Sequence, residues 1–302
     1  MRPFLLFALA SVAMIHSAHA QDDLIGQLGE EKSAPVYSTA AFKTTRVING
    51  HSLENTGHGV LDFRINHRFG FINGGAQEFF GLDGATVRLG FDYGVTDRLM
   101  VGIGRSGFQK TVDGFAKYRF LQQCDAGCSM PVTLAVVAAS SMTTLPANQV
   151  PWYSEDRMDY FTNRISYAFT VIVGRKFSDK FSFQLNPGVV HRNLVASSAD
   201  ANDVIHISGA GRMKLTKRIA LNAEYFYVLR GQLPEHYKNS LSVGFDLETG
   251  GHVFQLHFTN STGMFERAYI TETVGDWSNG DIHFGFNISR VFTVHTPKRP
   301  KS

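Results

Sequence analysis

A two-residue alternation of apolar and polar side chains constrains this chain more than any other feature. Leu241, Val243, Phe245 and Leu247, for example, alternate with Ser242, Gly244, Asp246 and Glu248. This period puts successive side chains on opposite faces of an extended strand. From residue 59 onward it predicts twelve strands, centred on residues 61–65, 87–95, 99–103, 116–120, 132–141, 165–173, 181–185, 204–215, 219–227, 241–247, 254–258 and 284–292.

The connections between these runs alternate in length. The long ones lie at 70–85, 106–113, 143–163, 195–203, 230–239 and 261–280, and the short ones at 96–98, 124–128, 178–180, 216–218 and 248–251. Bacterial outer-membrane barrels combine an even strand number with short periplasmic turns and longer extracellular loops. The sequence therefore predicts an all-β protein, an up-and-down antiparallel transmembrane β-barrel of about twelve strands.

The alternative is a soluble fold in which the apolar faces point inward. A closed barrel of twelve strands would then enclose an interior that side chains struggle to fill, since about eight strands already make a filled or ligand-sized barrel. Apolar faces toward lipid and polar faces toward the lumen remove that difficulty and leave no sheet edge in the membrane. A secreted soluble β-sandwich that binds a ligand stays open as the alternative.

Composition excludes several other classes. Gly accounts for 29 and Phe for 25 of the 302 residues. This bias disfavours a helical bundle, because Gly is a poor helix former, and disfavours disorder, because disordered chains are poor in aromatics. The net charge of +3 gives no indication of a nucleic-acid partner.

The first twenty residues have the features of a secretory signal. Arg2 provides the positive charge, residues 4–15 are apolar, and Ala18-His19-Ala20 forms a small-x-small cleavage site. We expect a cleaved signal peptide at 1–20 and a location in the bacterial outer membrane. The remaining boundaries are an N-terminal arm at 21–45, a barrel at 46–294 and a basic tail at 295–302. The arm is expected to be periplasmic, unless residues 41–49 enter the lumen as a plug or form an extra strand.

The chain has two cysteines, in the run Cys124-Asp-Ala-Gly-Cys128. Export favours a disulfide between them, and Gly127 can let the chain fold back far enough to close it. A metal site would need further ligands nearby, and haem attachment would need a C-x-x-C-H run.

Charged side chains recur on the polar faces of the predicted strands. We expect them to line the lumen as an ion-pair network, which could fill the barrel or surround a selective pore. Two histidines join them, His257 and His283, which an antiparallel register would make near neighbours and weak candidates for a metal site. The expected lumen residues are Asp62, Arg64, Arg88, Asp92, Lys117, Arg119, Glu224, Asp246, Glu248, His257 and His283.

Several stretches resemble an uncharacterised outer-membrane β-barrel family of Gram-negative bacteria, a domain of unknown function. They are residues 21–24, 41–52, 59–70, 80–83, 93–98, 101–106 and 280–290. The resemblance covers most of the mature chain and implies a barrel in the outer membrane, but it implies no chemistry. One departure is the C-terminus, where a basic tail follows Phe292 although many such barrels finish on a terminal aromatic residue.

No catalytic residues and no cofactor are predicted. Gly102-Ile-Gly104-Arg-Ser-Gly107 matches a dinucleotide-binding pattern by letter, but it lies in an alternating strand and opens no helix. The sequence favours a non-enzymatic barrel, acting as a narrow channel or a scaffold. Its expected partners are membrane lipid, the barrel-assembly machinery and a small polar solute. The alternative within the same fold is an outer-membrane hydrolase of phospholipase type, which would need a Ser and a His on the lipid-facing wall.

Overall fold

The computed structural model describes residues 34–156, 158–198 and 200–296, and divides the chain into two units. The smaller unit contains a two-stranded antiparallel sheet, β1 (Val36–Tyr37) with β6 (Cys124–Ala126). Cys124 and Cys128 form a disulfide there, with their Cα atoms 5.8 Å apart. The predicted signal peptide lies outside the described residues.

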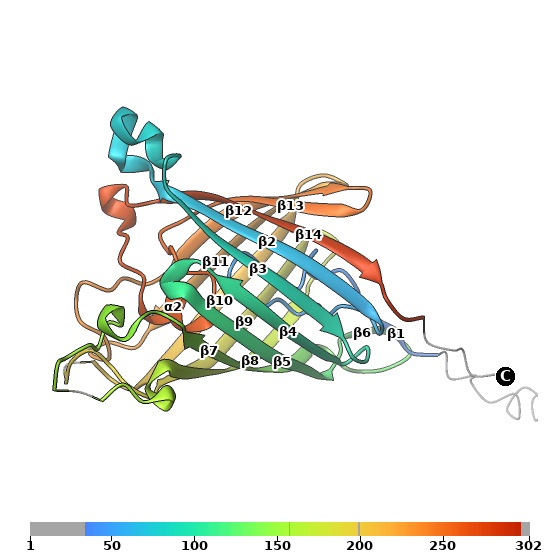
Figure 1. Cartoon of the computed structure of the whole chain (residues 1–302). Coiled ribbons are helices and arrows are strands. Elements are labelled where there is room, and N and C mark those ends of the chain that lie inside the picture. Colours follow the sequence, from blue (N-terminus) through green and yellow to red (C-terminus); the bar gives the residue numbers. More distant parts are fainter. Residues whose placement is uncertain (1–33, 157, 199, 297–302) are drawn as a thin grey trace, which may run out of the picture. The chain divides into compact units, whose positions relative to one another are not determined.

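The larger unit is a closed barrel (Figure 1) in which each strand pairs with its neighbours and β14 returns to β2. This confirms the predicted antiparallel barrel and its twelve strands. The strands are β2 (Val60–Phe71), β3 (Ala85–Gly94), β4 (Leu99–Ser106), β5 (Thr111–Leu121), β7 (Thr133–Thr143), β8 (Ile165–Lys176), β9 (Phe181–Arg192), β10 (Asp203–Lys214), β11 (Ile219–Val228), β12 (Leu241–Thr249), β13 (His252–Thr259) and β14 (His283–Thr293).

The helices are short and lie in the long connections, which Figure 1 shows gathered at one end of the barrel. They are η1 (Ile72–Gly81), η2 (Phe108–Lys110), η3 (Ala147–Gln149), η4 (Phe161–Arg164), α2 (Glu266–Thr271) and η5 (Trp277–Asn279). Within the described residues, no helix is long and apolar enough to cross a membrane.

Three of the short turns share one hydrogen-bond pattern. The hydroxyl oxygen of Thr96 accepts the backbone N–H groups of residues 98 and 99. Ser178 does the same for residues 180 and 181, and Thr216 for residues 218 and 219. A side-chain oxygen that satisfies two backbone donors favours a tight turn, which explains how such short connections reverse the chain.

The two faces of each strand differ as the alternation predicts. Phe245 on the outer face of β12 is 44% exposed, whereas the next residue, Asp246, is 3% exposed on the inner face. The outer face carries large apolar side chains on every part of the wall, among them Phe91, Ile103, Phe169, Leu185, Ile207, Tyr225 and Phe258. Because a β-barrel satisfies all its backbone groups between strands, such an outer face suits a lipid environment.

One expected boundary changes. The barrel was expected to begin at residue 46, but the first strand of its wall begins at Val60. Residues 46–59 contain no regular strand and belong to the segment that precedes the wall. Of the expected basic tail, only residues 295 and 296 are described.

An arginine on the outer face tests this assignment. We expect Phe245→Arg and Phe286→Arg each to lower the free energy of unfolding by about 2–4 kcal/mol, since each puts a charge near the middle of the bilayer. Asp246→Asn, on the inner face, is the control and should fold normally. Urea titration in lipid vesicles measures the difference. Normal insertion of both arginine variants would contradict a lipid-facing outer wall.

Candidate functional site in the barrel lumen

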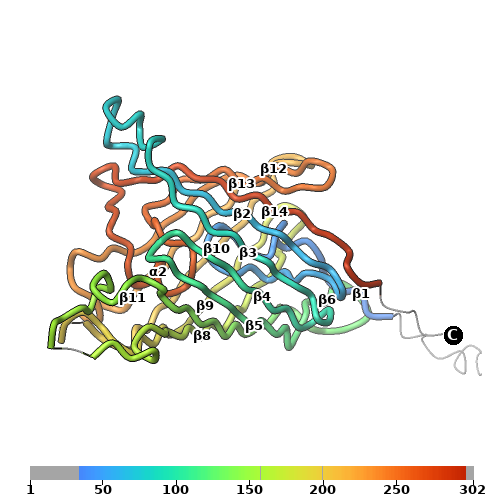
Figure 2. Tube along the Cα trace, in the orientation of Figure 1, coloured from blue at the N-terminus to red at the C-terminus, as the bar shows by residue number. Residues whose placement is uncertain are grey.

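A segment that precedes the first wall strand fills the middle of the barrel (Figure 2). We call residues 41–56 the plug. Its apolar side chains Phe42, Val47, Ile48 and Leu53 are almost completely buried. At its tip, Arg46 and His51 form an isolated antiparallel bridge, and the N–H of Val47 donates to the carbonyl of Gly50 at 2.8 Å.

Gly50 allows this tip to approach the wall closely. A Cβ atom at that position would lie 2.8 Å from the Cζ atom of Phe226 on β11. A larger residue would therefore displace either the Phe226 ring or the tip itself.

The carboxylate of Glu224 holds the plug tip to β11. It accepts the backbone N–H groups of Ile48 at 3.3 Å, Asn49 at 2.7 Å and Gly50 at 3.1 Å. Three converging N–H donors form an anion-binding turn, and hydrogen bonds to a charged acceptor are stronger than neutral ones. The Glu224 side chain thus binds three successive N–H groups of the plug tip to β11.

Other wall residues donate to the carbonyl groups of the plug. Lys117 Nζ donates to the carbonyls of Ser52 and Glu54, both at 2.6 Å. Side-chain amide groups on three further strands also donate to plug carbonyls. The bonds run from Gln184 to the carbonyl of His51 at 2.7 Å, from Gln255 to that of Val47 at 2.7 Å and from Asn287 to that of Ile48 at 3.1 Å. The plug is therefore bound from several sides of the wall.

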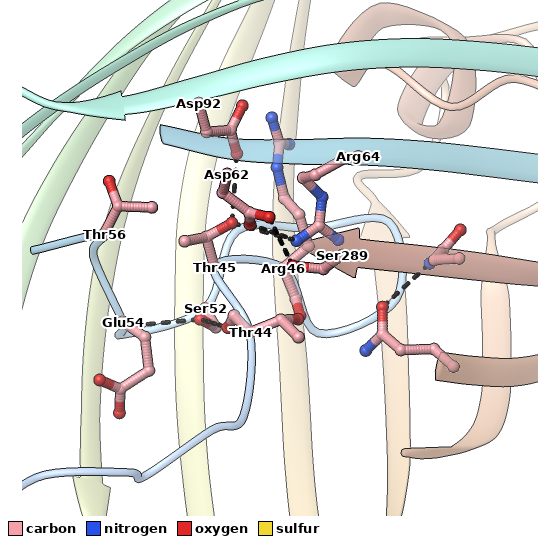
Figure 3. Close-up of polar contacts among 12 residues, drawn as sticks. Thr44, Thr45, Arg46, Ser52, Glu54, Thr56, Asp62, Arg64, Asp92 and Ser289 are labelled. Atoms are coloured by element: carbon pink, nitrogen blue, oxygen red, sulfur yellow. Dashed lines mark hydrogen bonds and ion pairs between the residues drawn. The ribbon is translucent and has the colours of Figure 1, made fainter. Parts of the chain in front are cut away.

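Near the short-turn end, buried ionic groups join the plug to β2, β3 and β14 (Figure 3). Thr45 Oγ1 lies 3.2 Å from both Asp92 Oδ2 and Arg64 Nη1. Arg64 Nη1 also lies 3.4 Å from Asp62, whose other oxygen accepts the Ser289 hydroxyl at 2.5 Å. The threonine hydroxyl thus bridges charges that belong to two different strands.

The long connection between β13 and β14 enters the lumen from the opposite end. All six residues of α2 are buried, and Glu266 Oε1 lies 3.0 Å from Arg46 Nη1 and 3.3 Å from His51 Nε2. Burial by itself raises the pKa of Glu266, but the His51 contact and the Arg46 charge outweigh it and hold that pKa below its usual range. Burial, reinforced by Arg46, lowers the pKa of His51. A neutral histidine and an ionic pair therefore connect the plug to α2.

The structure places the expected lumen charges in two groups. Asp62, Arg64, Arg88, Asp92, Lys117, Glu224 and Asp246 are buried on the inner face. Arg119 and Glu248 lie at the short-turn rim, where Arg119 Nη2 donates to the carbonyl of Asp97 at 2.8 Å and Glu248 pairs with Lys43 of the plug at 2.7 Å. Arg88 pairs with Asp113 at 2.5 Å, an interaction within the wall itself.

The two candidate histidines do not lie directly opposite each other. In the β13–β14 register, His257 faces Gly285 and His283 faces Thr259. Both ring nitrogens of His283 are already in hydrogen-bond contact, with the Phe69 carbonyl at 2.7 Å and the Thr262 hydroxyl at 2.8 Å. No group of three or more metal-ligating side chains occurs among the residues that the structure describes. The pair therefore gives no support to a metal site.

Sequence reasoning missed Arg68 and Glu266, and it included Arg46 only as part of the stretch 41–49 that could enter the lumen as a plug. Arg68 continues the inner face of β2 and donates to Asn49 Oδ1 at 2.7 Å, so a longer first strand would have identified it. Arg46 and Glu266 lie outside the strands. No alternation pattern could therefore have assigned them to the lumen.

A cavity of about 540 Å³ opens at the short-turn end, below the plug. It is lined by Lys43, Glu54 and Thr56 of the plug and by Asp62, Glu248 and Ser289 of the wall. We call it the vestibule. Its volume is in the range that holds small ligands, and these polar and charged groups share its lining with apolar side chains such as Phe42, Val60 and Val291.

Comparison with known proteins agrees with this architecture. Residues 42–292 match the family described as "Membrane bound beta barrel domain (DUF5777)", which confirms the family resemblance of the sequence. A search of curated proteins found no match.

Solved structures of similar topology include the NanC porin, with 10% identity, a TM-score of 0.47 and coverage of 76% of this chain and 98% of that one. Another is the COG4313 outer membrane channel from Pseudomonas putida F1, with 13% identity, a TM-score of 0.44 and coverage of 80% and 98%.

Removing the Glu224 carboxylate tests how the plug is held. We expect Glu224→Ala to speed maleimide labelling of a cysteine placed at Ile48 by at least about tenfold. The variant leaves three N–H groups without their charged acceptor, and each such hydrogen bond contributes roughly 1.5–3 kcal/mol to the free energy that holds the tip in place. Glu235→Ala, at an exposed carboxylate on the long-loop end, is the matched control and should leave the rate unchanged. Equal rates in folded Glu224→Ala protein would show that other contacts hold the tip.

Proposed function

Because the chain belongs to the family of membrane bound β-barrel domains, we propose that it is a gated, non-enzymatic channel of the outer membrane for small polar solutes. The plug closes the lumen in the present conformation and opens it by moving toward the short-turn end. Export through the signal peptide at 1–20 and insertion by the barrel-assembly machinery are parts of the same proposal.

One observation carries the gating proposal. Among the described residues, no backbone-to-backbone hydrogen bond joins the plug to a wall strand. The backbone-to-backbone bonds of the plug lie within the plug, as between the Ser52 N–H and the Thr45 carbonyl at 3.0 Å. All its hydrogen bonds to the wall involve a side chain. The plug can therefore leave without breaking any bond of the barrel ladder.

The exposed lumen would suit polar solutes. Departure of the plug uncovers Glu224, Lys117 and Asp92, which lie on different strands and carry both signs of charge. A pore lined by rings of mixed charge passes small hydrated molecules and discriminates among them by charge and size. The vestibule, crossed by the Lys43–Glu248 ion pair, would be the first compartment on the short-turn side.

The outward-facing histidine of β2 offers little to the hydrolase alternative. His67 points outward on β2, where its ring stacks on Phe286 at a centroid distance of 4.8 Å. Its partners on the two adjacent strands are Phe286 and Val87. A nucleophilic hydroxyl beside this histidine would be needed for acyl transfer, and neither cross-strand neighbour supplies one.

Conductance in planar bilayers tests the proposal. We expect the intact protein to be closed most of the time, and a variant lacking residues 21–56 to give a steady ionic current, because the deletion removes the plug but leaves every wall strand. Heat-modifiable migration on a gel establishes that each variant forms a barrel. A well-folded deletion variant without current would contradict a channel that the plug alone gates, because α2 would then still close the lumen.

A locked plug provides the complementary control. Asn49 Nδ2 and Ser242 Oγ are 3.0 Å apart, so Asn49→Cys with Ser242→Cys brings two thiols together between the plug and β12. Crosslinking them should abolish the brief openings of the intact protein, and reduction should restore them. The unmodified protein treated with the same reductant controls for loss of the Cys124–Cys128 disulfide.

A further inference from the structure

Three short turns present a cation at the same position. In the runs Thr96-Asp97-Arg98, Ser178-Asp179-Lys180 and Thr216-Lys217-Arg218, the first residue makes the turn and the third is basic. Because the turn geometry repeats, Arg98, Lys180 and Arg218 occupy equivalent places around the short-turn end. Lys217 adds a further charge in the last of these turns.

These cations are free of ion pairs. We define the basic rim as Arg98, Arg175, Lys180, Lys217 and Arg218, all of them exposed. Within the described parts of the chain, no carboxylate forms an ion pair with any of the five. The rim carboxylates of Asp179 and Glu248 pair instead with Lys176 and Lys43, and that of Asp97, in the turn of Arg98, accepts the backbone N–H of His58 at 3.1 Å. The rim therefore carries uncompensated positive charge.

The basic rim borders the apolar outer face. Arg175 lies over the ring of Phe177 at 5.8 Å, and Phe177 is 60% exposed. Phe181, Leu215 and Ile219, at the bases of the same turns, are also exposed. Aromatic and apolar residues that end at a line of cations are typical of the depth at which lipid headgroups begin.

The opposite rim is of mixed sign. Exposed cations of the long-loop end, among them Arg105, Lys110 and Arg230, lie beside exposed carboxylates that include Glu78, Asp83, Asp203 and Glu235. Arg105, Lys110 and Arg230 form no ion pair in the described parts of the chain either, so the two ends differ in the exposed carboxylates that surround their cations rather than in ion pairing.

We infer that the basic rim is a binding surface for the headgroups of anionic phospholipids in the leaflet on the short-turn side. Guanidinium and ammonium groups match phosphate oxygens in charge and hydrogen bonding, and cations near an anionic membrane surface each contribute to the attraction. The inference rests on the membrane-spanning barrel and is independent of the gating proposal.

Lipid retention tests this surface. The full-length protein is placed in nanodiscs of equimolar phosphatidylcholine and phosphatidylglycerol, and the lipids that stay bound are counted by native mass spectrometry. We expect a several-fold excess of phosphatidylglycerol at low salt. The triple variant Arg98→Gln, Lys180→Gln, Arg218→Gln should lose that excess, whereas Arg105→Gln, Lys110→Gln, Arg230→Gln, which removes as many charges from the other rim, should keep it.

The other outcomes of the lipid-retention experiment would contradict the proposed binding surface or change its ligand. No excess in the unmodified protein, or an excess that survives in the triple variant, would overturn the inference. Loss of bound phosphatidylglycerol on addition of millimolar inorganic phosphate would assign the rim to free phosphate instead. If the triple variant fails to fold, the unmodified protein in 1 M salt serves in its place. The Debye length there is about 3 Å, so the attraction between the rim cations and the lipid headgroups is screened and the phosphatidylglycerol excess should disappear.

Discussion

The width of a twelve-stranded barrel is the constraint on which the rest of the structure depends. About eight strands enclose an interior that side chains can fill, and larger barrels leave a cavity or a channel. Here two segments outside the wall strands enter the lumen, one from each end of the barrel. They are the plug, which precedes β2, and the connection with α2, between β13 and β14. The lumen is thus filled by segments outside the sheet.

Buried charge explains why the plug lies in one defined position. Isolated ionised groups in a dry interior are strongly unfavourable unless they are paired and hydrogen-bonded. Glu224 obtains three N–H donors from the plug, and Lys117 obtains two carbonyl acceptors. The charges of Glu224 and Lys117 are therefore satisfied by backbone groups of the plug. Gly50 allows the close approach that brings this backbone within reach of Glu224.

The wall could be predicted from the sequence and the contents of its lumen could not. Alternation assigns Phe245 and Asp246 to opposite faces because strand geometry alone decides the faces. The partners of Asp92 and Glu224, by contrast, are Thr45 and the backbone of residues 48–50. These contacts join residues far apart in the chain through a segment without periodicity, so no local pattern specifies them. The Thr/Arg-rich stretch 41–49 did indicate a plug, but it could not show which strands hold it.

The two inner segments leave the lumen in opposite directions. The plug enters and leaves at the short-turn end, where Ser38 bonds to Gln123 and Gly59 bonds to Gly94, each through its N–H at 2.8 Å. The connection that contains α2 returns to the long-loop end, at β13 and β14. They meet where Arg46 and His51 contact Glu266. Displacement of α2 by an event at the long-loop end would remove the carboxylate that neutralises Arg46, leaving a buried cation in the plug. Because an unpaired buried charge is costly, that event would weaken the contacts of the plug from the opposite end of the lumen.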